Sequence, residues 1–284
     1  MHLLKKLAQR LAAANAPATT GHEPHRAAIL DQYVREAPSP QAALDLFKGD
    51  WWSSFPGAFG GLRAGHLPLF DDARIHWAIG ALGGVEGKTV LELGPLEGGH
   101  TFVLENAGAR SILAIEASSK AYLKCLVAKE ILGMQRARFA LGDFEEYLRG
   151  APDRFDIAIA CGVLYHLKDP VELIHNLARV TDRVFIWTQY YVQERLAAIE
   201  HMKHRFRQSH AAEHAGFRYT AYRYEYGDFL DTTRFAGGSD EFSHWLGRDD
   251  LLGALRHAGF GKIEVGEEDL EHANGPCISL VARK

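Results

Sequence analysis

From Thr89 onwards, short apolar runs alternate with helical segments, and this alternation constrains the fold more than any other feature of the sequence. Alternation at this spacing is typical of a parallel sheet covered on both faces, whose strands are nearly continuous apolar runs. The fold class is therefore predicted to be α/β, with a doubly wound, mostly parallel, seven-stranded Rossmann-like sheet. The predicted strands are 89–93, 111–116, 137–141, 155–161, 183–188, 262–265 and 277–281. The predicted helices are 99–107, 119–132, 144–149, 170–179 and 248–258.

The composition narrows the class of protein. The chain has 284 residues and a net charge of −4, which argues mildly against nucleic acid as the main partner but does not exclude a local basic patch. Its three cysteines are widely spaced without a CxxC pair, as expected in a reducing compartment and not in a disulfide framework. No apolar run approaches the roughly 18 residues needed to span a bilayer. The protein is predicted to be cytoplasmic, and no oligomeric state is implied.

The segments outside this alternation are predicted to be additions to a domain over 86–284. Residues 1–85 are rich in helical and loop patterns and are predicted to form an N-terminal helical cap. The first helix of this cap is amphipathic, so it either packs or binds a membrane surface or a partner. Residues 189–248 interrupt the alternation, and insertions of this kind often form a lid or substrate-binding region. Inside it, 194–214 is predicted to be helical, followed by a strand at 222–226 and a turn at Gly237-Gly238.

The end of the first predicted strand carries a candidate binding site in the run ELGPLEGG, which begins at Glu92. A strand, a glycine turn and a helix form the geometry that binds nucleotide-like ligands in α/β sheets. The dinucleotide fingerprint G-x-G-x-x-G is not met, because Leu96 occupies its second glycine position. Glu92 and Glu97 stand at this turn without a basic residue, which favours a cationic ligand over a pyrophosphate.

Acidic residues also follow the second and third predicted strands. Glu116 is placed to accept hydrogen bonds from both hydroxyls of a ribose. Asp143 is placed to accept one from an exocyclic amine, while Phe144 can cover an adenine face. Asp143 can also cap the helix that follows it, with Glu146 as a capping-box partner, and the two roles are compatible.

These motifs, together with FDIAIACGVLYHLKDP at the fourth strand, resemble the successive motifs of class I S-adenosylmethionine-dependent methyltransferases over about residues 85–190. The resemblance implies S-adenosylmethionine as the cofactor, no metal, and methyl transfer by in-line displacement to a positioned acceptor. Carried over position by position, it also implies which residues contact the methionine part, the ribose, the adenine and the sulfonium. These are, in that order, Glu92, Gly94, Pro95 and Gly98; Glu116 and Ala117; Asp143 and Phe144; and Cys161.

The stretch GVLYHLKDP is also similar to the same stretch of the bacterial tRNA wobble-uridine carboxymethyltransferases, which use carboxy-S-adenosylmethionine. In that family, the tyrosine that matches Tyr165 helps to hold the extra carboxylate of the cofactor. His166 can act as a general base on the acceptor, or it can orient the loop through a structural hydrogen bond. Tyr165 and His166 are the candidate catalytic residues.

Three functions remain open from the sequence. Methyl transfer to an oxygen or nitrogen of a small molecule is favoured, because the chain is net acidic. The alternatives are a tRNA wobble-uridine methyl- or carboxymethyltransferase, and a protein that binds S-adenosylmethionine without turning it over. In the predicted lid, His201 and His204, or His210 and His214, would share a helical face and could bind a metal. A solvated or substrate-facing helix is the plainer interpretation, and basic and aromatic neighbours could grip RNA or an anionic small molecule.

Overall fold

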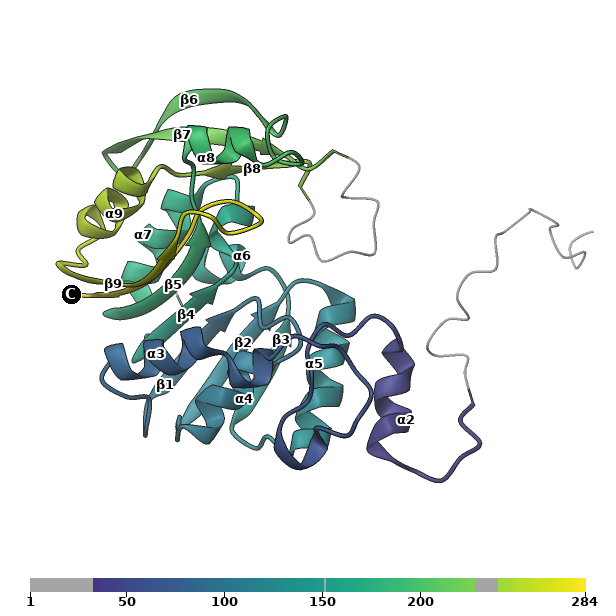
Figure 1. Cartoon of the computed structure of the whole chain (residues 1–284). Coiled ribbons are helices and arrows are strands. Elements are labelled where there is room, and N and C mark those ends of the chain that lie inside the picture. Colours follow the sequence, from purple (N-terminus) through teal and green to yellow (C-terminus); the bar gives the residue numbers. More distant parts are fainter. Residues whose placement is uncertain (1–32, 151, 228–239) are drawn as a thin grey trace, which may run out of the picture.

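The computed structural model describes residues 33–150, 152–227 and 240–284, and its centre is a seven-stranded sheet (Figure 1). The strand order is β3-β2-β1-β4-β5-β10-β9. Strands β1 to β5 pair in parallel, and β10 lies antiparallel between β5 and β9. The predicted doubly wound, mostly parallel sheet is therefore confirmed. Its strands are β1 (Thr89–Leu93), β2 (Ser111–Glu116), β3 (Ala137–Leu141), β4 (Ile157–Cys161), β5 (Arg183–Gln189), β9 (Lys262–Asp269) and β10 (Cys277–Arg283).

Helices cover both faces of this sheet and bury its apolar strands. One layer of the core contains side chains of α7 and α9 packed against strand residues. A second layer contains side chains of α3 and α4, also packed against strand residues. Strand β4 is buried along its whole length, as a strand covered on both faces must be. The helices are α3 (Ala73–Ala81), α4 (Gly99–Asn106), α5 (Ser119–Leu132), α6 (Phe144–Arg149), α7 (Pro170–Val180) and α9 (Arg248–His257).

Capping residues in the sequence account for the helix starts on the carboxyl side of the strands. Ser118 accepts a hydrogen bond from the backbone N–H of Ala121, and Asp169 accepts one from that of Glu172. Such caps satisfy N–H groups that have no partner within the helix. Helix α5 then ends at Gly133, whose φ of 67° is the left-handed conformation common after helices.

The described part of the N-terminal region packs against α5. It contains α2 (Pro40–Leu44) and the 3-10 helices η2 (Asp45–Phe47), η3 (Gly57–Phe59) and η4 (Leu69–Asp71). The buried aromatic side chains of this region join the core formed by α5 and β3. The predicted amphipathic first helix lies outside the described residues, and the predicted domain boundaries at 85–86, 189 and 248 stay predictions.

The predicted helix over 194–214 is wrong for most of its length. Only α8 (Gln193–Ala198) is helical, and β6 (Phe206–His214) pairs antiparallel with β7 (Phe217–Glu225). The two-residue turn between them has positive φ at both Ala215 and Gly216, as a type I′ hairpin turn requires. The sequence Ala-Gly lacks the asparagine or aspartate that usually marks this turn, so the hairpin left no clear signal.

This correction also removes the argument for a metal-binding helix face. His210 and His214 lie on a strand, and His201 and His204 precede it in irregular structure. Within the described residues, no group of three or more histidine, cysteine or acidic side chains is arranged to hold a metal ion. The turn at Gly237-Gly238 lies outside the described residues.

Strand β8 (Phe242–Trp245) completes a small three-stranded sheet, with the order β6-β7-β8. This small sheet lies beyond one end of the large sheet (Figure 1). The backbone N–H of His244 on β8 donates to the carbonyl of Leu167, just after the 3-10 helix η5 (Leu164–His166). The small sheet is thereby fastened to the loop that follows β4, where the candidate catalytic residues lie.

Candidate active site

The turn after β1 has three left-handed residues, at Gly94, Leu96 and Gly98, with φ of 64°, 57° and 79°. Leu96 thus keeps the left-handed conformation that a glycine would adopt at this position of the usual motif, although a left-handed residue with a side chain is strained. At Gly94 a glycine is required for a second reason, because a Cβ there would lie 2.7 Å from Cγ1 of Val163. The turn after β1 and the loop after β4 are in close contact.

Glu116 lies at the carboxyl end of β2 and points back to this turn. Its Oε2 accepts the backbone N–H of Leu96 at 3.1 Å, and its Oε1 accepts that of Ser118 at 2.8 Å. Burial raises the pKa of Glu116, while the backbone hydrogen bonds from these residues act in the opposite direction. A carboxylate has about four lone-pair sites, so further donors can still be accepted.

Glu92 supplies a second buried carboxyl group below the turn. Its Oε2 accepts a hydrogen bond from the Thr101 hydroxyl at 2.5 Å, whereas its Oε1 is buried and has no hydrogen-bond partner in the structure. Burial raises the pKa of Glu92. An unpartnered buried oxygen is costly, so this group favours a ligand that donates hydrogen bonds or is positively charged.

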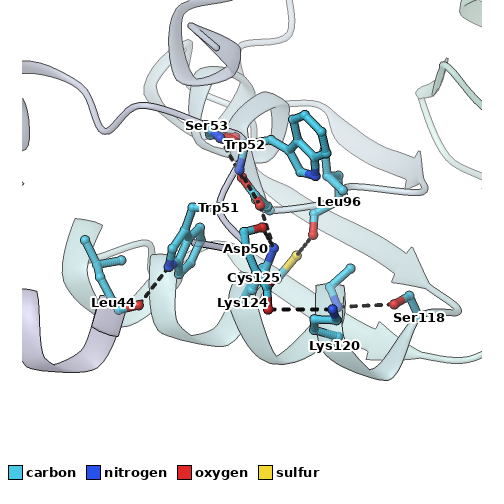
Figure 2. A network of polar contacts seen from close by, with 12 residues as sticks. Leu44, Asp50, Trp51, Trp52, Ser53, Leu96, Ser118, Lys120, Lys124 and Cys125 are labelled. Atoms are coloured by element: carbon cyan, nitrogen blue, oxygen red, sulfur yellow. Dashed lines mark hydrogen bonds and ion pairs between the residues drawn. The ribbon is translucent and has the colours of Figure 1, made fainter. Parts of the chain in front are cut away.

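Glu97 has a structural role in the same turn. Its carboxylate accepts the backbone N–H groups of Trp52 and Ser53 and forms an ion pair of 2.9 Å with Lys124 of α5. Figure 2 shows Lys124 directed toward this network and toward the carbonyl of Asp50, to which it also donates. Glu97 therefore ties the N-terminal segment to the turn and to α5, and its charge is already paired.

The other predicted cofactor residues occupy the same edge of the sheet. Pro95 is buried within the turn, and Ala117 directly follows Glu116 at the end of β2. Asp143 caps α6 by accepting the backbone N–H of Glu145 at 2.7 Å, which confirms its structural role. The proposed capping-box partner Glu146 instead pairs with Arg149 at 2.6 Å, so that part of the prediction is wrong. Phe144, the first residue of α6, is half-buried beside this cap.

A cationic cluster that the sequence analysis did not identify lies on the other side of the turn. The Asp72 carboxylate is bound by Arg74 and by Nε2 of His100, the latter at 2.9 Å. Burial favours the neutral His100 ring, but the neighbouring Cys161 and Asp72 outweigh it and raise the pKa of His100 to about 10. Arg74 lies 4.5 Å from the ring centre of Trp187. With two cations and one carboxylate, this cluster is net positive beside Cys161 at the end of β4.

Tyr165 and His166 follow β4 and are enclosed by aromatic side chains. The ring centres of Tyr165 and His166 are 4.1 Å apart, and Tyr165 lies 6.0 Å from Trp187 and 5.9 Å from Trp245 of β8. Burial raises the pKa of Tyr165 and lowers that of His166 to about 3. His166 is therefore neutral at physiological pH.

The hydrogen bonds of His166 leave one of its nitrogens free. Its Nδ1 lies 2.7 Å from the hydroxyl oxygen of Tyr226, and that oxygen lies 3.3 Å from the hydroxyl of Ser243. Each hydroxyl can donate or accept, so both neutral tautomers of His166 fit these contacts; in the tautomer whose Nδ1–H donates to Tyr226, Nε2 keeps its lone pair. Nε2 of His166 and Nε1 of Trp245 are both buried and have no hydrogen-bond partner among the described residues. His166 and Trp245 both pack against Tyr165, so each brings an unsatisfied ring nitrogen to this aromatic enclosure.

Comparison with known proteins identifies the family. A model of the methyltransferase domain matches residues 85–245. The chain belongs to the methyltransferase domain family. The N-terminal domain of EvdMO1, crystallised in the presence of S-adenosylhomocysteine and D-fucose, is 25% identical, with a TM-score of 0.65 over 86% of this chain and 94% of that domain. The predictions of an S-adenosylmethionine-dependent methyltransferase and of its cofactor are thereby confirmed.

Two further comparisons differ in what they support. A methyltransferase from Mesorhizobium loti, 15% identical with a TM-score of 0.51 over 76% of this chain and 100% of that one, shares the fold. A tRNA U34 carboxymethyltransferase from Psychrobacter arcticus is 29% identical over 124 residues. That match spans 39% of this chain and only 35% of the Psychrobacter enzyme.

Among the described residues, no helix combines the length and the apolar character needed to cross a membrane.

Proposed function

We propose that this methyltransferase methylates a hydroxyl group of a small, hydroxyl-rich molecule, with His166 as the proton acceptor. The observation that carries the proposal is Nε2 of His166, which is buried without a hydrogen-bond partner among the described residues and lies within an aromatic enclosure after β4. Trp245, whose ring centre lies 5.9 Å from that of Tyr165, adds an unsatisfied N–H donor. A ligand with hydroxyl groups satisfies both atoms, since each hydroxyl both donates and accepts.

The residues around the turn after β1 fit S-adenosylmethionine. Glu116 retains acceptor capacity for ribose hydroxyls, and Glu92 offers an unpartnered oxygen to a cationic group. The cluster of Arg74 and His100 offers positive charge to the cofactor's carboxylate. Pro95, Gly94 and Gly98 shape the turn, while Ala117, Asp143, Phe144 and Cys161 complete the predicted contacts. When bound, this cofactor supplies a methyl group already activated by a positively charged sulfur.

The chain's own contribution is then to position the acceptor, exclude water and remove a proton. In the tautomer whose Nδ1–H donates to Tyr226, Nε2 accepts the hydroxyl proton as methylation makes the acceptor oxygen positively charged, since a base with a pKa of about 3 takes a proton only at that stage. Tyr165 packs against the ring and limits its rotation. Nε2 is inaccessible to solvent, and Tyr226 and Ser243 lie beside the His166 ring, so entry of the acceptor requires side chains around His166 to move; movement of the segment that carries Tyr226 and Ser243 would correspond to the lid predicted from the sequence.

The relative crystallised with D-fucose supports a sugar-like acceptor, whereas the shorter similarity to a tRNA-modifying enzyme favours RNA. The test is product formation, measured as S-adenosylhomocysteine release and as added mass on the acceptor, with D-fucose, other deoxysugars and unmodified tRNA supplied in turn. We expect methylation of a sugar-like molecule, and methylation of tRNA alone would overturn the proposal. His166→Ala is expected to lower kcat by about 100-fold or more with unchanged S-adenosylhomocysteine affinity, while the exposed control His204→Ala leaves both unchanged.

A further inference from the structure

A cavity lies at the opposite edge of the large sheet, away from the candidate active site. It has a volume of about 680 Å³ and is lined by residues at the starts of β1, β4, β5 and β9 and at the end of β10. All of these strand ends lie at one edge because β10 runs antiparallel to its neighbours. The candidate active site occupies the other edge, and five strand residues separate the two by on the order of 15 Å.

The lining of this cavity is strongly basic in a chain that is net acidic. Seven of its residues are lysine or arginine and two are aspartate, whereas the whole chain has a net charge of −4. Like charges gathered at one place repel one another, and such clusters focus a positive potential within a concave surface. The distribution therefore points to an anion as the partner of this edge.

The two aspartates do not neutralise the cavity. Asp182 is shared between Arg154, at 2.7 Å, and Lys284, at 3.2 Å. Asp156 is engaged by the backbone N–H and the hydroxyl of Thr89, at 2.8 and 3.0 Å. Arg283 is paired in addition with Glu264, at 3.0 Å, so that the seven basic side chains of the lining still outnumber the carboxylates around them.

Three basic residues of the lining have no direct ion-pair partner. Within the parts of the chain that the structure describes, Lys88, Arg110 and Lys262 form no ion pair and no side-chain hydrogen bond, although Lys88 and Arg110 help to lower the pKa of Asp156. Arg183 uses one guanidinium nitrogen on the carbonyl of Leu82, at 3.3 Å, and has no carboxylate partner in the same described residues. Guanidinium groups bind phosphate oxygens in pairs, and ammonium groups bind them as point charges.

We infer that this cavity binds a compact, multiply charged phosphate ligand of nucleotide size, at a site separate from methyl transfer. Its volume lies within the range of about 300–1,000 Å³ typical of small-molecule sites. Phe155 adds an aromatic side chain to the lining, against which a base can pack. The acidic character of the remaining chain argues against an extended nucleic-acid surface.

Calorimetry with the full chain tests this inference, with inorganic pyrophosphate, ADP and a single-stranded oligonucleotide as probes at low and moderate salt. The test variant is the triple substitution Lys88→Ala, Arg110→Ala and Lys262→Ala. The control is Lys48→Ala, Lys203→Ala and Arg218→Ala, which removes the same charge from the surface outside the cavity.

We expect pyrophosphate and ADP to bind the unsubstituted protein and to bind the cavity variant about tenfold or more weakly, since charge-assisted hydrogen bonds are lost. The control variant is expected to bind within about twofold of the unsubstituted protein, because exposed charges at a distance are screened. S-adenosylhomocysteine affinity is expected to stay unchanged in both variants.

Three results would overturn the inference. Absence of pyrophosphate and ADP binding at low salt would mean that the cavity is only a solvated basic surface. Equal weakening by the control variant would show that overall charge, and not this cavity, attracts the anion. Much tighter binding of the oligonucleotide than of ADP, with a steep salt dependence that the cavity variant abolishes, would assign the cavity to a nucleic-acid backbone.

Discussion

The ion pair between Glu97 and Lys124 is predicted to be a main determinant of stability, and Lys124→Met is the perturbation that tests it. The side chains of Glu97 and Lys124 are only 0% and 5% exposed. Replacing the lysine with an apolar side chain of similar length leaves a buried carboxylate to which, among the described residues, only the backbone N–H groups of Trp52 and Ser53 still donate.

The magnitude follows from what remains around that carboxylate. A lost hydrogen bond between charged groups accounts for about 1.5–3 kcal/mol, and breaking a buried pair from one side costs about 3–5 kcal/mol because the remaining charge is uncompensated. Lys124→Met is therefore expected to lower the free energy of unfolding by about 3–5 kcal/mol. In Lys124→Met with Glu97→Gln, the buried charge is absent, and a large part of this loss is expected to be recovered.

Urea unfolding followed by circular dichroism measures both variants, with the slope against urea used to check that the extent of unfolding is unchanged. Lys120→Met on the same helix is the control, because its pairing with Asp50 is longer, at 3.7 Å, and more exposed. A loss below about 1 kcal/mol in Lys124→Met, or a double variant less stable than the single one, would refute the role assigned to this pair.

Three further predictions concern local features. The pKa of His100 is raised from 6.5 to about 10, so its stabilising contribution is complete below about pH 6.5 and is lost as the pH rises through 10. The stability of His100→Gln, measured by unfolding at several pH values, is expected to lack this dependence on pH. Equal pH profiles for the variant and the unsubstituted protein would contradict the assignment. Gly94→Ala is expected to destabilise the fold by about 1–3 kcal/mol more than Gly133→Ala in thermal unfolding, because both have positive φ but only the former meets a neighbouring side chain. Ala215→Asn is expected to raise the free energy of unfolding by about 0.5–1 kcal/mol, because asparagine adopts the left-handed conformation of this turn more readily than alanine does. Ala211→Asn, at an exposed position of β6, is not expected to stabilise the protein, and equal effects of the two substitutions would exclude the turn as the cause.

The large sheet could be predicted from the sequence because its determinants are local. Helix α5 begins after Ser118 and ends before Gly133, as its capping residues indicate, and the strands before it are continuous apolar runs. Glu116 could be located for the same reason, since it directly follows a buried strand. These signals need no knowledge of the tertiary structure.

The remainder depends on contacts between distant segments. Asp72 and Arg74 reach the site only because α3 packs beside α4, so nothing in their own neighbourhood marks them. His100 stands within the glycine motif, but its charge follows from the neighbouring Asp72 and Cys161, which outweigh the opposing effect of burial. Strand β6 is exposed along most of its length, so it lacks the apolar alternation that identifies half-buried strands.

The link from Glu97 to the N-terminal segment bears on where the protein can be cut. The methyltransferase family match begins at residue 85, yet the buried carboxylate of Glu97 is covered by the backbone of Trp52 and Ser53. A Cβ at Gly99, the first residue of α4, would lie 2.5 Å from the carbonyl oxygen of Leu69, which shows how closely the two segments approach. The cooperative folding unit therefore extends upstream of the conventional domain boundary. A truncated protein beginning at residue 85 would expose an apolar surface on α5. It would also expose the ion pair of Glu97 and Lys124 to water, although both side chains are buried in the full chain.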